Sequence, residues 1–290
     1  MSDFKHHNNV DALLWLQTSA EWTASFIQAY RLAQMRIEAE VASAKPGERL
    51  CITTDLDETL FDNSAYNEFL VRNGRNFNET GNWARYCEAK ISKAMPGVSA
   101  FYEWLASRHP GVEVFFVTSR LNALRQPTAD NLAVLAKVPV KTAADPDPQV
   151  TRLFMGGFKV PVAKPDGTMG EGVTKYDHYR FIEESLGYRT ILRLGDNASD
   201  FHPDFGSRVK PADRLANAER LADHWGRDWI QLPNPVYGGF LQSLRNADGK
   251  AVTEDYGTAA GMVDDEVRTP RSPQTTPKVA FLDPWAPPAS

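Results

Sequence analysis

A short apolar run that ends in two aspartates constrains the fold of this chain more than any other stretch. Residues 50–54 are apolar or β-branched and follow the turn residues Lys45-Pro46-Gly47. Such a run is typical of a strand that is buried on both faces of a parallel sheet. Asp55 and Asp57 come at its end, where open α/β sheets place their ligand crevice.

The spacing of these two aspartates allows both side chains to belong to one site only if the chain turns between them. Side chains two residues apart on an extended segment lean toward one pocket when the chain turns after Leu56. Such a turn leaves the carbonyl of Asp57 able to coordinate a cation. The alternative for this stretch alone is an ordinary acidic junction between a strand and a loop.

Further apolar runs and their connections predict the fold class. The expected core strands are 50–54, 112–117, 190–194 and 229–232, with a short strand at 153–155 inside an otherwise irregular stretch, 138–172. Helices are expected over 10–44 with a break near Ser19, and over 96–107, 121–136, 175–186 and 212–224. This alternation predicts an α/β fold with a doubly wound parallel sheet.

The connection after the first strand is long enough to form a cap. Residues 63–93 have a helical pattern rich in aromatic residues, and an insertion at this place is suited to act as a lid. We expect four parts: an N-terminal helical region that packs with the cap (1–45), a core (46–62 and 94–246), a small, mainly helical cap (63–93) and a proline-rich, mostly disordered tail (247–290).

Charge and composition exclude some classes of partner. A net charge of -5 argues against binding to nucleic-acid polymers, which needs a basic face. No stretch reads as a membrane span, and the polar residues 1–9 do not read as a signal peptide. A cytoplasmic location is expected if Met1 is the true start, and export if a signal was removed. Cys51 and Cys87 are expected to be reduced, buried thiols.

Polar and charged side chains follow three of the expected core strands. They are Asp55, Asp57, Thr118, Ser119, Asp196 and Asp200. Because the carboxyl ends of parallel strands meet at one edge, we expect these side chains to line one crevice. Lys175 begins the helix before the third of these strands, so its amine is expected to reach the crevice; Lys159 and Lys164 are the alternatives.

The order of these motifs resembles the haloacid dehalogenase (HAD) superfamily of phosphatases. The matching strings are Asp55 to Leu60, Thr118 to Arg120, Lys175, and Gly195 to Phe201. Further strings narrow the resemblance, over about residues 10–245, to the class C acid phosphatases, the lipoprotein e group of 5'-nucleotidases: Gln17 to Glu21, Asp57 to Ser64, Met95 to Gly97, and Leu232 to Gly238. Ser119 stands where that family commonly has asparagine, and the family's lipoprotein signal is not seen.

The resemblance implies a Mg²⁺-dependent acid phosphatase that forms an aspartyl phosphate. Asp55 would attack phosphorus, and Asp57 would protonate the leaving group and later deprotonate water. Other implied roles are catalysis by Thr118 and Lys175, substrate binding by Ser119 and Arg120, orientation of Lys175 or a metal-bound water by Asp200, and Mg²⁺ binding by Asp55, the Asp57 carbonyl and Asp196. Because Asp57 must be protonated to act as an acid, we expect an acidic pH optimum.

The resemblance also implies a small phosphomonoester substrate, with nucleoside 5'-monophosphates favoured. Trp83 and Tyr237 are candidates to stack on a nucleobase, and the alternative for both is a place in the core. A non-nucleotide metabolite and a homodimer stay open, whereas a non-catalytic storage-type relative is disfavoured because Asp55 is present. Four neighbours of the motifs are expected to have supporting or structural roles: Glu58, Asp62, His178 and His202.

Overall fold

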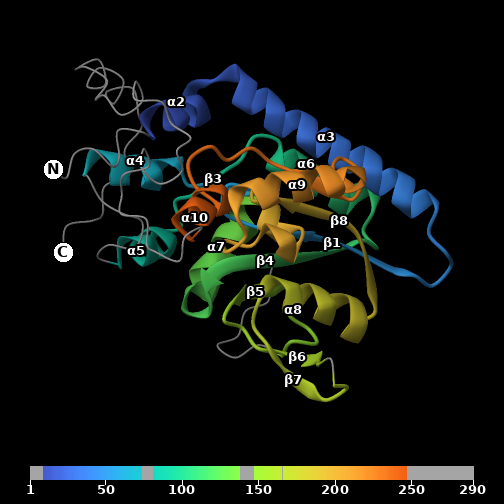
Figure 1. Ribbon diagram of the computed structural model, residues 1–290. Coiled ribbons are helices and arrows are strands. Elements are labelled where there is room, and N and C mark those ends of the chain that lie inside the picture. The colour runs from blue at the N-terminus through green and yellow to red at the C-terminus, as the bar shows by residue number, and fades with distance from the viewer. Residues whose placement is uncertain (1–8, 74–80, 138–146, 165, 247–290) are drawn as a thin grey trace.

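The centre of the molecule is a parallel sheet with strand order β5-β4-β1-β8-β9 (Figure 1). The computed structural model describes residues 9–73, 81–137, 147–164 and 166–246. The sheet strands are β1 (Arg49–Thr54), β4 (Glu113–Leu121), β5 (Leu153–Gly156), β8 (Tyr188–Gly195) and β9 (Trp229–Gln231). The predicted α/β class with a parallel sheet is confirmed, and each of the four long apolar runs overlaps a strand, to within one residue at Val112 and Leu232.

β1 lies in the middle of the sheet because both of its faces are apolar. Every residue of β1 after Arg49 is buried. Its last residue, Thr54, is in register with Phe116 of β4 on one side and Leu194 of β8 on the other. Asp55 is therefore delivered to the carboxyl edge between these two strands, where the chain changes direction across the sheet.

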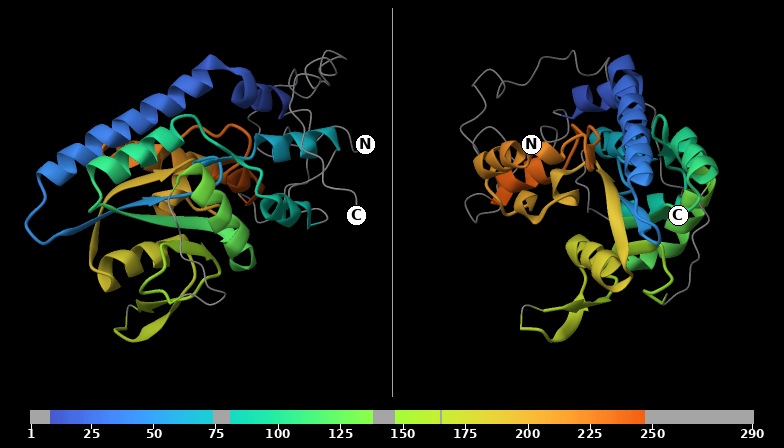
Figure 2. Two further views of the ribbon diagram at one scale, coloured as in Figure 1. Left: turned by 180° about the vertical axis from the view of Figure 1, so that it is seen from behind. Right: turned by 90° about the vertical axis from the view of Figure 1, so that its right-hand side faces the viewer.

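Helices cover both faces of this sheet (Figure 2). On one face lie α3 (Ala20–Ala42), α6 (Val98–Arg108) and α7 (Arg125–Leu135), and on the other α8 (Lys175–Arg180) and α9 (Pro211–Arg220). The helix expected over 175–186 continues as a π-helical turn over Phe181–Ser185. Short 3-10 turns follow several strands and helices: Asn122–Leu124, Ala198–Asp200, Pro203–Phe205 and Ala222–His224.

The long N-terminal helix is broken where the sequence predicted. α2 (Val10–Thr18) ends at Ser19, whose backbone is extended, and α3 begins one residue later. The Ser19 hydroxyl accepts a hydrogen bond from the N–H of Trp22 at 3.0 Å, which caps one of the otherwise unsatisfied donors of α3. Among the described helices, none has both the length and the apolar character of a membrane span.

The insertion after β1 forms a small helical unit that is closed by two short strands. β2 (Phe61–Asp62) pairs antiparallel with β3 (Lys93–Ala94), and between them lie α4 (Ser64–Arg72) and α5 (Asn82–Ala89). The helices share a hydrophobic cluster, formed by Tyr66, Phe69, Leu70 and Tyr86. This agrees with the helical pattern of 63–93, of which 74–80 lie outside the described residues. The division of the chain into domains stays a prediction.

Three local predictions are wrong. The stretch 138–172 was expected to be irregular apart from one strand, yet β6 (Val160–Ala163) and β7 (Met169–Gly172) form an antiparallel hairpin. Pro161 in the first strand and two glycines in the second conceal its pattern. β4 continues four residues beyond the predicted end, through Leu121. α10 (Gly239–Asn246) was not predicted, and the tail 247–290 lies outside the described residues.

Candidate active site

Three buried carboxylates gather at the carboxyl ends of β1 and β8. The N–H of Asp55 donates to the carbonyl of Leu194 at 2.9 Å, which fastens the end of β1 to β8 just before Asp196. One side-chain oxygen of each of Asp55, Asp196 and Asp200 lies within 4.8 Å of the others. The ends of the two strands therefore meet as the sequence predicted. The side chain of Asp200, for which the sequence predicted an orienting role, also lies in this group.

Lys175 lies beside this group. Its Nζ is 2.7 Å from Asp55 Oδ1 and 2.7 Å from Asp200 Oδ1. The lysine starts α8, whose N-terminus is fixed by a capping box between Thr174 and Asp177. Lys159 is exposed and paired with Glu171, so Lys175 is the lysine that the fold brings to the carboxylates.

The group carries more negative charge than Lys175 can balance. The pKa of Asp55 is raised from 3.8 to about 7, chiefly by burial; Lys175 opposes this rise, and Asp200 and Asp57 add to it. The pKa of Asp196 is raised well above its ordinary value by burial and then by Asp200 and Asp55. Burial lowers the pKa of Lys175, but Asp200 and Asp55 outweigh it and hold that pKa well above its ordinary value. An all-oxygen site of this kind suits a hard divalent cation.

The chain turns after Leu56, which is the condition for the side chains of Asp55 and Asp57 to lean toward one pocket. The carbonyl of Leu56 accepts hydrogen bonds from the N–H groups of Thr59, Leu60 and Phe61 at 3.2, 2.7 and 2.8 Å. Glu58, inside the turn, has a φ of 55°, a left-handed conformation that is uncommon for a residue other than glycine. The strained backbone of Glu58 lies in the loop that carries Asp57.

The segment 118–120 does not present all three side chains to solvent. Thr118 is buried, and its hydroxyl accepts from the N–H of Arg120 at 3.1 Å. Ser119 is exposed. Arg120, predicted to bind substrate, points inward and forms an ion pair with Asp57, with 2.6 Å between Arg120 Nη2 and Asp57 Oδ1.

The two candidate stacking residues both have neighbours within the protein. Trp83 packs on Tyr86 and against the edge of Tyr66, with ring centroids 5.7 and 5.1 Å apart. The hydroxyl of Tyr237 donates to Glu58, so the loop after β9 reaches back to the turn that carries Asp57. Both rings are only partly buried.

Two polar residues of the site were not singled out from the sequence. Asn234 donates to Asp196 Oδ2 at 2.7 Å, and Asn63 donates to Asp57 Oδ1 at 2.8 Å. Both belong to the strings that carry the family resemblance, which is the only signal that could have marked them. The pKa of the fully buried Glu58 is raised well above its ordinary value by burial and then by Asp57.

The two histidines have structural positions, as predicted. His178 is buried with Nε2 2.8 Å from the carbonyl of Phe158, and His202 accepts from the N–H of Asp204. The two cysteines are buried and free, as predicted.

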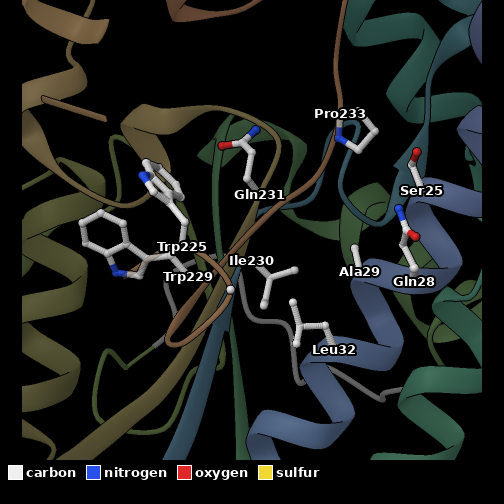
Figure 3. A pocket seen from close by; sticks show the side chains of 10 residues that line it. Ser25, Gln28, Ala29, Leu32, Trp225, Trp229, Ile230, Gln231 and Pro233 are labelled. Carbon is white, nitrogen blue, oxygen red and sulfur yellow. The ribbon is translucent and has the colours of Figure 1, made fainter. Parts of the chain in front are cut away.

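A separate cleft of about 590 Å³ lies between α3 and the segment 225–233 (Figure 3). It is lined by Ser25, Gln28, Ala29, Leu32, Trp225, Gly226, Trp229, Ile230, Gln231 and Pro233. None of these side chains can act as an acid, a base or a metal ligand of the usual kind. Gln231 links the cleft to the backbone at Asp196, because its amide donates to the carbonyl of Asp196 at 2.5 Å.

Comparison with known proteins places this geometry in a family. The family model of the HAD superfamily, subfamily IIIB (acid phosphatase), matches residues 3–240. A crystal structure of the class C acid phosphatase from Bacillus anthracis with tungstate bound has a similar fold, with a TM-score of 0.67 and 24% identity over 84% of this chain and 91% of that chain. A second structure of that enzyme has a TM-score of 0.66 at the same identity and coverage.

Proposed function

The chain belongs to the HAD superfamily, subfamily IIIB, the acid phosphatases, and on this premise we propose that it is a Mg²⁺-dependent 5'-nucleotidase that forms an aspartyl phosphate on Asp55. The observation that carries the proposal is the buried group of Asp55, Asp196 and Asp200 around Lys175. Phosphoryl transfer needs a nucleophile and fixed positive charge more than elaborate covalent chemistry, and this group supplies the nucleophile and one cation.

Asp55 has the position expected of the nucleophile. It lies at the end of the central strand, its backbone is held by Leu194, and its Oδ1 is paired with Lys175 at 2.7 Å. The pairing keeps the carboxylate oriented and helps to keep it ionised, as attack on phosphorus requires. Lys175 would also stabilise the charge on the transferred phosphoryl oxygens.

The residues present fit a hard divalent cation. Three carboxylates share one ammonium group, and burial raises the pKa of both Asp55 and Asp196, as expected of carboxylates that lack part of their counter-charge. Asp55, Asp196 and the carbonyl of Asp57 would hold Mg²⁺, and Asp200 would orient Lys175. When bound, the cation would neutralise the carboxylates and polarise the phosphate.

Asp57 would act as general acid and then as general base. It lies two residues beyond Asp55, on a turn fixed by the Leu56 carbonyl, so both side chains belong to one loop. Thr118, on the neighbouring strand β4, would bind a phosphate oxygen. General catalysis of this kind is typically worth about 10²- to 10⁴-fold in rate.

A nucleoside monophosphate is the substrate that we propose, because aromatic residues flank the acid loop. Tyr237 is tied to Glu58, next to Asp57, and Trp83 lies over the Arg120 side chain at 5.3 Å. A nucleobase that stacks on such rings would gain about 1 to 3 kcal/mol per contact. The alternative is a non-nucleotide phosphomonoester, which would need neither ring.

A phosphate-release screen tests both parts of the proposal. Several dozen phosphomonoesters, among them the nucleoside 5'-monophosphates and glycerol phosphate, would be assayed with Mg²⁺, with other divalent cations and with chelator. We expect nucleoside 5'-monophosphates to be hydrolysed with the highest kcat/KM and the activity to vanish with chelator. Chelator-resistant turnover would contradict the metal assignment.

The role of Tyr237 is tested by a split between two substrates. Tyr237→Ala should raise KM for nucleoside 5'-monophosphates about tenfold or more and barely alter glycerol phosphate. Tyr237→Phe, which removes the hydroxyl bound to Glu58 but keeps the ring, is the matched control. Equal losses on both substrates in Tyr237→Ala would assign Tyr237 a structural role and favour the non-nucleotide substrate.

A further inference from the structure

The carboxylate of Asp57 is held unequally at its two oxygens. Oδ1 accepts from Arg120 Nη2 at 2.6 Å, from Arg120 Nε at 3.0 Å and from Asn63 Nδ2 at 2.8 Å. Oδ2 accepts one longer hydrogen bond, from Arg120 Nε at 3.1 Å. The Asn63 amide cannot flip freely, because Ser92 donates to its Oδ1 at 2.8 Å.

Arg120 is itself fixed, so it can set the direction of another group. Its side chain is 1% exposed, whereas that of Asp57 is 17% exposed. The guanidinium carbon lies 4.6 Å from the ring centre of Phe61 and 5.3 Å from that of Trp83, and Nη1 donates to Thr128 at 3.3 Å. A planar group held on its faces and at its nitrogens binds a carboxylate in one orientation.

We propose that Arg120 is a positioning residue that aims Asp57 at the leaving group, rather than a ligand of the substrate phosphate. This inference rests on the proposed phosphatase function. Oδ1 is occupied by donors in both protonation states of Asp57, since a carboxyl oxygen without hydrogen accepts the same bonds. Oδ2 is therefore the oxygen that carries the proton.

The proton path follows from this assignment. As an oxygen of Asp55 forms its bond to phosphorus, the bond from phosphorus to the leaving oxygen breaks, and the proton on Asp57 Oδ2 passes to that oxygen. In the second step a water gives one of its protons to Asp57 Oδ2 as its oxygen bonds to phosphorus, its other proton stays on that oxygen, and the bond from Asp55 to phosphorus breaks. Arg120 keeps its contacts to Oδ1 throughout and exchanges no proton.

Leaving groups of different basicity test the proposal. An alkoxide such as that of glycerol phosphate needs a proton to leave, whereas p-nitrophenolate hardly does. Arg120→Met should lower kcat/KM for glycerol phosphate by about 100-fold and for p-nitrophenyl phosphate by less than about fivefold. Arg120→Lys, which keeps the charge but not the fork of donors, should show the same selectivity and provides the test if Arg120→Met does not fold.

A double-mutant cycle separates positioning from phosphate binding. In the Asp57→Asn background, Arg120→Met should cause no further loss on glycerol phosphate. Arg152→Met is the matched control, because Arg152 also pairs with a carboxylate and lies over aromatic rings, and it should affect both esters equally.

Two results would overturn the inference. Equal losses on both esters in the Arg120 variants, or a loss that persists in the Asp57→Asn background with a raised KM, would make Arg120 a phosphate ligand. The failure of the proposed function has a different signature, since the unaltered protein would then release phosphate from neither ester.

Discussion

Replacing Asp196 by asparagine should stabilise the metal-free protein at neutral pH and remove its stabilisation by Mg²⁺. The reason is the excess of buried negative charge, because three carboxylates share Lys175. Asn234 can still donate to the side-chain oxygen of the new amide, as it does to Asp196 at 2.7 Å. The substitution therefore removes a charge with little loss of packing.

The pKa shifts give the sign and the scale of the effect. The pKa of Asp55 rises from 3.8 to about 7 on folding, and the pKa of Asp196 is also raised. A carboxyl whose pKa is raised in the folded state contributes stability below its unfolded pKa, and that contribution is lost as the pH rises through the folded pKa. At about 1.4 kcal/mol per unit, the shift of Asp55 corresponds to about 4 kcal/mol, lost between about pH 4 and pH 7.

We expect Asp196→Asn to raise the free energy of unfolding by about 2 kcal/mol at pH 8 in chelator. This gain is smaller than the value for the Asp55 shift, because the new NH₂ group needs a hydrogen-bond partner. In Mg²⁺ at about 100 times its Kd, the unaltered protein should gain about 2.7 kcal/mol and the variant much less. The order of stability therefore reverses between the two conditions.

Urea unfolding followed by tryptophan fluorescence at pH 5 and pH 8, with chelator or Mg²⁺, measures these differences. Asp130→Asn is the control, because Asp130 is on the surface and pairs with Lys90 far from the group. A variant that is less stable than the unaltered protein in chelator at pH 8, or equal stabilisation of both by Mg²⁺, would refute the reasoning.

Three further predictions concern single residues. Asp55→Asn should keep its fold but lose turnover, and substantial hydrolysis by a pure preparation would point to another nucleophile. Gly195→Ala should lower kcat/KM for p-nitrophenyl phosphate about 100-fold or more, because an added Cβ would lie 2.6 Å from Oδ2 of Asp200; a loss under about tenfold would contradict this packing. Burial lowers the pKa of His178 from 6.5, so the contribution of this imidazole to stability should fall as the pH drops below about 6.5, opposite to the trend from Asp55. In urea unfolding, the free energy of unfolding of His178→Phe should rise relative to that of the unaltered protein between pH 7 and pH 5, and a constant difference would count against a buried neutral imidazole.

The sheet and the carboxylate group could be predicted because their signals are local. Each strand contains a run of mostly apolar or β-branched residues, and parallel strands deliver Asp55 and Asp196 to one edge whatever the details of the packing. Lys175 could be placed for the same reason, as the first residue of a helix whose end faces that edge.

The direction of Arg120 could not be predicted from its neighbours in sequence. Polar residues near the end of a strand usually face solvent, but Arg120, in β4, turns inward because its guanidinium packs on the rings of Phe61 and Trp83 and pairs with the carboxylate of Asp57. These residues belong to the turn after β1, to β2 and to the cap. The inward direction of the Arg120 side chain therefore depends on tertiary contacts. Asn234 is similar, since only the fold brings it to Asp196.

The central place of β1 also bears on the order of events during folding. Thr54 pairs with Phe116 and with Leu194, which lie 62 and 140 residues further along the chain. The carboxylates Asp55 and Asp196 therefore meet only after β8 has closed the longer of these two loops, a contact that forms slowly because of its chain separation. A cation that needs both carboxylates binds after this step, and for that reason it should slow unfolding while leaving the folding rate almost unchanged.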